Sequence, residues 1–109
     1  MVKDGLVVKA EASENQDFLN KILDTDAGSR RLGEFAIGTN KMVKTYMNNV
    51  LFDEKMYGTV HMAIGEAYEE CKGINKSAIH MDIVKDMTEK GSSVTVDGKV
   101  VLKDGKILV

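Results

Sequence analysis

Three segments of the chain alternate apolar and polar residues with the period of two that is typical of β-strands. They cover residues 31–37, 59–64 and 77–84. A shorter apolar run from Leu6 to Val8 indicates an opening strand. Because one face of each long segment is apolar, the pattern predicts a sheet that packs one face against a core.

Two other segments have helical periodicity. Ser13, followed three residues later by Gln16, forms a possible capping box for a helix over 14–23. Between Met42 and Leu51, apolar residues recur at intervals of three and four. This second pattern predicts an amphipathic helix whose methionine-rich face enters the core.

The end of the chain has the pattern of a small antiparallel meander. Two Asp-Gly dipeptides, which favour hairpin turns with positive φ, separate its three strand segments. Those segments are 93–96, 99–102 and 106–109. Helices and strands follow one another without a regular βαβ rhythm, so the sequence predicts an α+β fold with a mixed or antiparallel sheet, a few short helices and a C-terminal meander. A length of 109 residues predicts a single domain, 1–109.

Charge and composition exclude several classes of partner. Fifteen basic and seventeen acidic residues give a net charge of −2 without any run of like charge. Nucleic acids and anionic membranes are bound through concentrated positive charge, so neither is an expected partner. No apolar stretch approaches the roughly 18 residues of a membrane helix, and the first residues do not form a signal peptide pattern. The single cysteine, Cys71, excludes an internal disulfide. These features predict a cytoplasmic protein.

Potential metal ligands occupy the polar face of the three strand patterns. They are Glu34, His61, His80 and Asp82. Residues two apart in a strand point to the same side, and neighbouring strands lie about 4.8 Å apart, so these four side chains could converge. Two imidazoles with carboxylates suit zinc, cobalt or manganese. The same alternation is also typical of a half-exposed sheet that binds nothing.

Four blocks of sequence, taken in order, resemble the C-terminal portion of the thermophilic metallo-aminopeptidases, the M29 peptidase family. The ending VDGKVVLKDGKILV is similar to the closing hairpins of that family, so the resemblance covers nearly the whole chain. The blocks are LGEFAIGTN (32–40), VLFDEK (50–55), GTVHMAIGEAY (58–68) and NKSAIHMD (75–82).

This resemblance implies a two-metal exopeptidase that removes an amino acid from the free N-terminus of a peptide. Two divalent ions (zinc, cobalt or manganese) would activate a water for attack on the peptide bond. Tyr68 matches a tyrosine that is expected to support the tetrahedral intermediate. The residues that match metal ligands of the family are Glu34, Glu54, His61, His80 and Asp82.

The chain also departs from the family pattern. Members of the family have a large N-terminal domain and a further metal-binding glutamate, which these 109 residues do not contain. We therefore expect weak or absent activity for this polypeptide alone, and a homodimer that covers apolar surface. The alternative is a non-catalytic assembly or interaction module that retains the fold.

Overall fold

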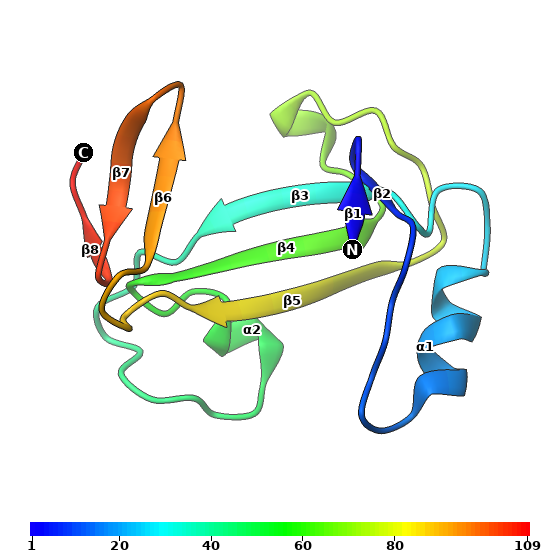
Figure 1. Ribbon diagram of the computed structural model, residues 1–109, viewed down its shortest axis with the longest axis horizontal. Coiled ribbons are helices and arrows are strands. Elements are labelled where there is room, and N and C mark those ends of the chain that lie inside the picture. Colours follow the sequence, from blue (N-terminus) through cyan, green and yellow to red (C-terminus); the bar gives the residue numbers. More distant parts are fainter. The chain divides into compact units, whose positions relative to one another are not determined.

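A computed structural model describes residues 1–109 and has two α-helices, one 3-10 helix and eight strands (Figure 1). The predicted α+β class is confirmed, since the strands form three small sheets with the orders β1-β2, β3-β4-β5 and β6-β7-β8. No helix is long and apolar enough to cross a bilayer. The elements are β1 Val2–Lys3, β2 Leu6–Val7, α1 Gln16–Leu23, β3 Leu32–Ile37, α2 Val50–Asp53, β4 Thr59–Gly65, η1 Glu69–Cys71, β5 His80–Asp86, β6 Ser93–Val96, β7 Lys99–Lys103 and β8 Lys106–Ile107.

The chain divides into two compact units, and all three strands of the β3-β4-β5 sheet contribute residues to both. Unit 1 contains Met1–Phe35 and Met62–Asp82. Unit 2 contains Ala36–His61 and Ile83–Val109. Each unit is described separately below, and the expectation of a single domain stays a prediction.

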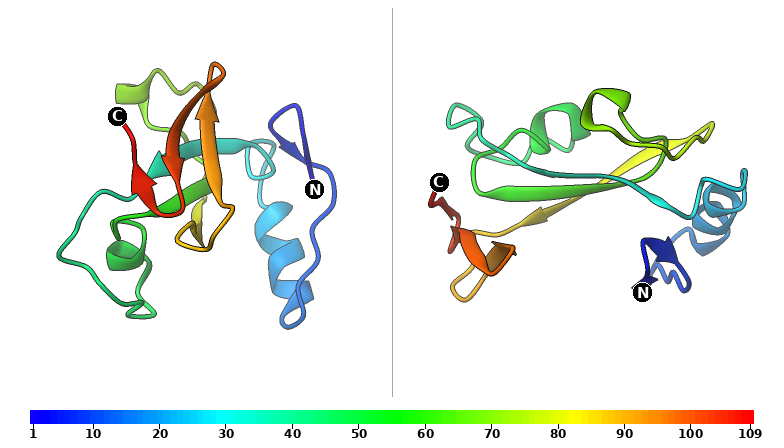
Figure 2. Two further views of the ribbon diagram at one scale, coloured as in Figure 1. Left: turned by 60° about the vertical axis from the view of Figure 1, so that its left-hand side comes forward. Right: turned by 90° about the horizontal axis from the view of Figure 1, so that it is seen from above.

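Unit 1 has a small apolar core. Its buried members are Val7, Leu23 and Ile64. Helix α1 contributes Leu23, and Figure 2 shows this helix beside the segment that carries β1 and β2. The β1-β2 hairpin is attached to the start of β3 by two main-chain hydrogen bonds, from the Val7 amide to the Arg30 carbonyl (2.7 Å) and from the Leu32 amide to the Gly5 carbonyl (2.8 Å). Leu32, at the start of β3, packs against this core.

The predicted helix over 14–23 is present, but its capping box is not. Asn15 is the N-cap residue, and no side chain caps the helix there. The Gln16 side chain accepts a hydrogen bond from the Ala12 amide (2.7 Å) rather than from Ser13. Because Asn15, in a left-handed conformation (φ 56°), is the N-cap residue, the helix begins two residues later than a Ser13 cap requires.

Unit 2 contains the predicted meander. The β6-β7 and β7-β8 pairs are antiparallel, and both Asp-Gly turns have positive φ at both residues, as that dipeptide favours. The Tyr57 hydroxyl accepts a hydrogen bond from the Ile107 amide (3.1 Å), which attaches β8 to the segment before β4. Leu102 of β7 is fully buried. Leu102 thus anchors the meander in this unit, although most other residues of its strands are exposed.

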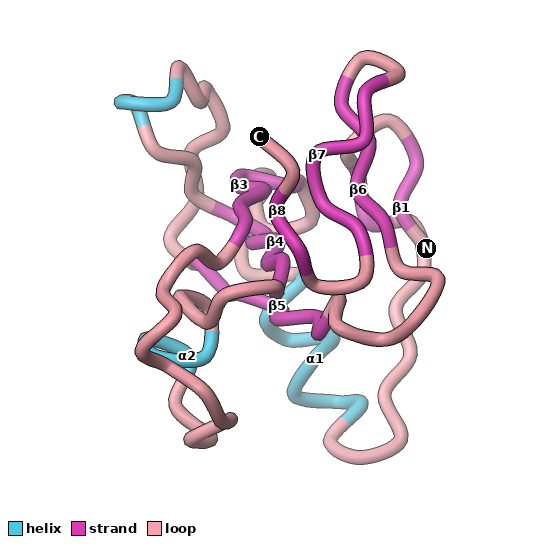
Figure 3. The backbone as a smooth tube through the Cα atoms, turned by 90° about the vertical axis from the view of Figure 1, so that its left-hand side faces the viewer, coloured by secondary structure: helices cyan, strands magenta, loops and turns pink.

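The predicted helix between Met42 and Leu51 is wrong. Only Val50–Asp53 is helical, and residues 41–49 form the long connection drawn as loop in Figure 3. Met42 and Leu51 are 85% and 72% exposed, so the methionine-rich stripe is not core. The helix begins late because the Asn49 side chain accepts from the Leu51 amide (3.1 Å) and caps the helix at that point.

Candidate metal centre

The structure brings three of the predicted ligands together in unit 1. Nε2 of His80 lies 3.2 Å from Oε2 of Glu34 and 3.4 Å from Oδ1 of Asp82. Each of the three side chains places one ligand atom within 4.8 Å of the others. His80 and Asp82 share a face of β5 because they are two residues apart. The group is therefore a compact set of one imidazole and two carboxylates.

Glu34 reaches the other two residues across a central strand. It lies on β3, and β4 separates β3 from β5 in the sheet. At this level β4 carries Ala63, which is fully buried, followed by Gly65 on the same parity. Since these residues are small, they leave space in which long side chains of the outer strands can meet.

A main-chain carbonyl fixes the orientation of the His80 ring. Nδ1 of His80 lies 2.7 Å from the Glu66 carbonyl oxygen, which can only accept, so Nδ1 carries the proton. Nε2 then faces the two carboxylates with a lone pair or a second proton. Burial opposes that second proton, but the Glu66 carbonyl and the charges of Asp82 and Glu34 outweigh it and raise the pKa of His80 above its usual value. A cation at Nε2, either a proton or a metal, is thus what the surroundings favour.

Tyr68 lies beside this group. Its ring centroid is 5.2 Å from that of His80, with the rings tilted by 50°. The side chain is half exposed and lies just before the short 3-10 helix η1. Its hydroxyl can therefore donate to a ligand that approaches the ring of His80.

Two further predicted ligands, Glu54 and His61, lie close together in unit 2. Both are buried, and their ligand atoms are within 4.8 Å of each other. Lys55 forms an ion pair with Glu54. From the sequence alone, Asp53 and Glu54 could also be a solvated helix end. That interpretation is wrong, because each residue is only 7% exposed.

The expected burial of the two sheet faces needs correction. The pattern predicts that the apolar parity is buried and the ligand parity is displayed. Instead Phe35 and Ile83, next to ligands in sequence, are 54% and 52% exposed, whereas His61 is 4% exposed. Glu34, His80 and Asp82 are partly buried. Alternation identified which residues share a face, but it could not show that β4 is covered on both faces, where Val60 and Ile64 are buried as well as His61.

Sequence reasoning missed the Glu66 carbonyl. No side-chain pattern reports on a main-chain acceptor, and the turn that presents it depends on Gly65, which has φ +97°. The only available signal was the glycine itself, directly after the predicted strand over 59–64.

The donor set fits a divalent transition metal. Imidazole nitrogen with carboxylate oxygen and no thiolate is a combination that zinc, cobalt and manganese accept. Oδ1 of Asp82 is buried and accepts no hydrogen bond of ordinary geometry, although Nε2 of His80 lies 3.4 Å from it. A buried carboxylate oxygen without a donor is costly, and coordination to a cation would satisfy it.

Comparison with known proteins identifies the family. The family model for the thermophilic metalloproteases, M29, matches residues 1–107. The chain belongs to the M29 family. The resemblance noted from the four sequence blocks is thereby confirmed, and M29 membership implies use of a divalent metal.

Several M29 relatives are named aminopeptidases. The chain is 35% identical to Aminopeptidase 2 of Geobacillus stearothermophilus, with 95% of this chain and 28% of the relative covered. It is 36% identical to Aminopeptidase T of Thermus aquaticus, with 93% and 27% covered. The structure of wild-type AmpT from Thermus thermophilus matches with a TM-score of 0.77 at 26% identity, covering 99% of this chain and 31% of that one. The chain thus spans about a quarter to a third of the length of these M29 proteins.

Proposed function

We propose that this chain is the metal-binding part of an aminopeptidase that hydrolyses the N-terminal peptide bond of peptides. The observation that supports this most strongly is the group formed by Glu34, His80 and Asp82, whose side chains are suitable ligands for a divalent metal. Membership of a metalloprotease family gives independent support. The names of the relatives supply the expected reaction.

Two ions are proposed, held by two sets of side chains. Glu34, His80 and Asp82 would hold one, and Glu54 with His61 would provide ligands for the other. Bound divalent ions would supply Lewis acidity, polarising the scissile carbonyl and lowering the pKa of water. Zinc, cobalt and manganese are all compatible with these donors.

The protein's own groups have separate tasks in this proposal. The Glu66 carbonyl holds the His80 ring so that Nε2 faces the ligand position. Tyr68 donates a hydrogen bond to the oxygen that becomes negative as water attacks the carbonyl carbon, a contribution of about 3 kcal/mol for a well-placed donor. Replacing Tyr68 with Phe should therefore leave metal content unchanged and lower any residual turnover.

We expect weak or absent turnover from the 109-residue chain alone. Most of each relative's length lies outside the matched region, and five ligand side chains are few for two ions. A leucyl anilide assay with added cobalt or zinc tests this expectation. Turnover at ordinary enzyme rates, above about 1 per second, would contradict it.

Metal analysis separates the enzyme proposal from the alternative of a non-catalytic module. Protein purified without chelator and then supplied with zinc or cobalt should retain at least one ion per chain after desalting. A ligand set that has lost its function would retain less than about one ion per two chains, because intact sites bind tightly. Low occupancy would therefore favour the assembly or interaction module.

A homodimer is also proposed. Phe18, Phe35 and Ile74 in unit 1 are 65%, 54% and 92% exposed, and apolar surface of this kind favours association. Light scattering tests this proposal, and a clean monomer at high protein concentration contradicts it.

A further inference from the structure

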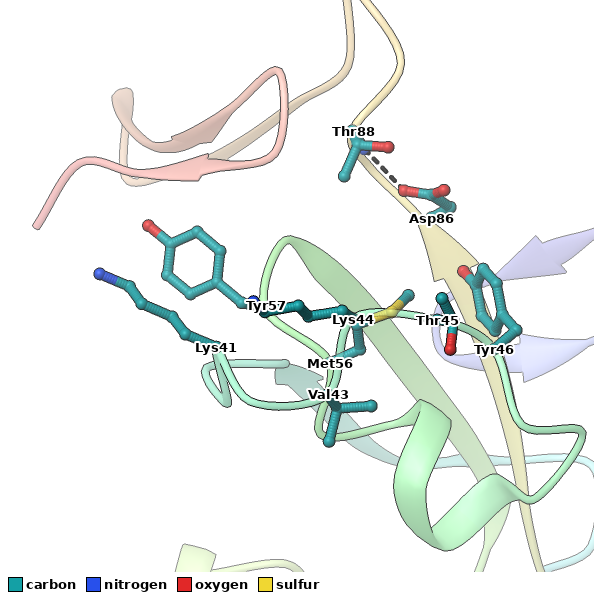
Figure 4. A pocket seen from close by; sticks show the side chains of 9 residues that line it. All are labelled: Lys41, Val43, Lys44, Thr45, Tyr46, Met56, Tyr57, Asp86 and Thr88. Atoms are coloured by element: carbon teal, nitrogen blue, oxygen red, sulfur yellow. Dashed lines mark hydrogen bonds between the residues drawn. The ribbon is translucent and has the colours of Figure 1, made fainter.

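A pocket within unit 2 is separate from the ligand side chains described above. It encloses about 390 Å³, which is within the range of small-molecule sites. Figure 4 shows its lining side chains, which come from the loop after β3, the residues before β4 and the end of β5. Buried Met56 and half-buried Val43 supply apolar surface. The pocket can therefore hold the apolar body of a small ligand.

One end of the pocket is positively charged. Nζ of Lys41 lies 5.0 Å from the centroid of the Tyr57 ring, a cation–π contact, and Lys44 extends toward the same tyrosine (Figure 4). Neither ammonium group has a carboxylate partner in the chain. Two lysines that line one pocket without a carboxylate partner favour an anionic group there.

The other end of the pocket carries a carboxylate and a hydroxyl. One oxygen of Asp86 accepts from the Thr88 amide (2.8 Å), which leaves the second oxygen able to accept from a ligand. Burial and the charges of Asp86 and Asp53 raise the pKa of Tyr46. A tyrosine hydroxyl is protonated at neutral pH, so that of Tyr46 can donate. The pocket thus offers cations at one end and an acceptor at the other.

We propose that this pocket binds the C-terminal residue of a short peptide. The carboxylate would lie at Lys41 and Lys44, the side chain on Met56 and Val43, and the backbone N–H toward Asp86. Such a ligand thus has an anionic group for the lysines, an apolar side chain for the apolar surface and an N–H donor for the carboxylate of Asp86. The inference concerns binding alone and stands whether or not the chain hydrolyses peptides.

Tyrosine fluorescence provides the test, because the chain has three tyrosines, two of them in this pocket, and no tryptophan. The probe is N-acetyl-L-leucine, titrated in the presence of EDTA so that its carboxylate has no metal to bind. A dissociation constant on the order of 1 mM is expected for a ligand of this size. N-acetyl-L-leucinamide, which lacks the carboxylate, should bind at least about fivefold more weakly.

Variants locate the binding. Lys41→Met and Lys44→Met should each weaken binding of N-acetyl-L-leucine by about fivefold, whereas Lys99→Met, an exposed lysine in the β6-β7 hairpin, should leave it unchanged. Circular dichroism of each variant verifies the fold. Equal binding of the acid and the amide, equal loss in the Lys99 variant, or inorganic phosphate binding as tightly as N-acetyl-L-leucine would each overturn the proposal.

Discussion

Nδ1 of His80 lies 2.7 Å from the main-chain carbonyl oxygen of Glu66. That hydrogen bond decides which ring nitrogen is available, because the carbonyl can only accept. Nε2 is consequently the atom directed at the carboxylates of Glu34 and Asp82. The carbonyl directly follows Gly65, whose φ is +97°, so the geometry of the candidate metal centre is set partly by the main chain.

The first prediction concerns the proposed metal ligands. Asp82→Asn keeps the size of the side chain but replaces the anionic ligand with a neutral amide. We expect zinc or cobalt affinity, measured by calorimetry, to fall by more than about tenfold. Mutation of a residue that only hydrogen-bonds to a metal ligand already lowers metal affinity by about 10–100-fold. Glu14→Gln, at an exposed position before α1, is the matched control and should change nothing. Unchanged affinity in Asp82→Asn would remove this residue from the metal site.

Gly65→Ala should be strongly destabilising. A Cβ there would lie 2.1 Å from the Ile79 carbonyl oxygen, and the backbone has φ +97°. We expect a loss of at least about 3 kcal/mol in the free energy of unfolding, measured with urea. Metal affinity should fall as well, because Ile79 directly precedes His80.

Gly91→Ala is a control that separates the backbone strain of a positive φ from the steric clash of an added Cβ. Gly91 has a similar φ of +93°, but a Cβ there meets no atom within 4 Å. It should cost only the backbone strain, about 1–2 kcal/mol, and leave metal affinity unaltered. If the two glycine variants were equally stable, the close approach between Gly65 and Ile79 would not be a constraint.

The strands and the ligand faces could be predicted from sequence because both depend on local periodicity. Glu34, His80 and Asp82 were placed on polar parities, and those parities converge within unit 1. The helix predicted between Met42 and Leu51 failed although its periodicity was good. The helix did not form because side chains accept hydrogen bonds from main-chain amides in this segment. Those contacts depend on the tertiary structure, and hydrophobic periodicity does not reveal them.

A third prediction follows from that failed helix. Asp53 is buried, and its two oxygens accept from the amides of Met47 (2.8 Å) and Asn49 (3.2 Å). Asp53→Ala leaves both amides without an acceptor and should cost about 1–3 kcal/mol. Trypsin should then cleave faster after Lys44. Asp53→Asn retains one carbonyl acceptor and should give an intermediate rate, and equal rates in all three proteins would contradict this role.

The last prediction concerns pH. The carboxylate of Asp26 accepts hydrogen bonds from the Ala78 amide (2.7 Å), from the Ser77 hydroxyl (2.9 Å) and from groups in its own loop, Ser29 and Gly28. The Ala78 bond is the main cause that lowers the pKa of Asp26 to about 2; burial opposes the shift, and the other hydrogen bonds add to it. A carboxylate whose folded pKa is depressed stabilises the fold above its unfolded pKa, near 3.8. That stabilisation should be lost as the pH falls from about 4 to about 2.

Asp26→Asn should therefore lower the melting temperature at neutral pH and flatten its fall between about pH 4 and pH 2. An amide cannot replace the carboxylate, because both oxygens accept and the nitrogen of Asn would face the Ala78 or Gly28 amide. Asp17→Asn, an exposed position on α1, makes the same change of charge without these hydrogen bonds and should keep the wild-type profile. Because Asp26 secures the residues that lead into β5, the Asp26 variant should also bind zinc more weakly. Parallel melting curves in wild type and Asp26→Asn across the acid range would show that the loop holds β5 by other contacts.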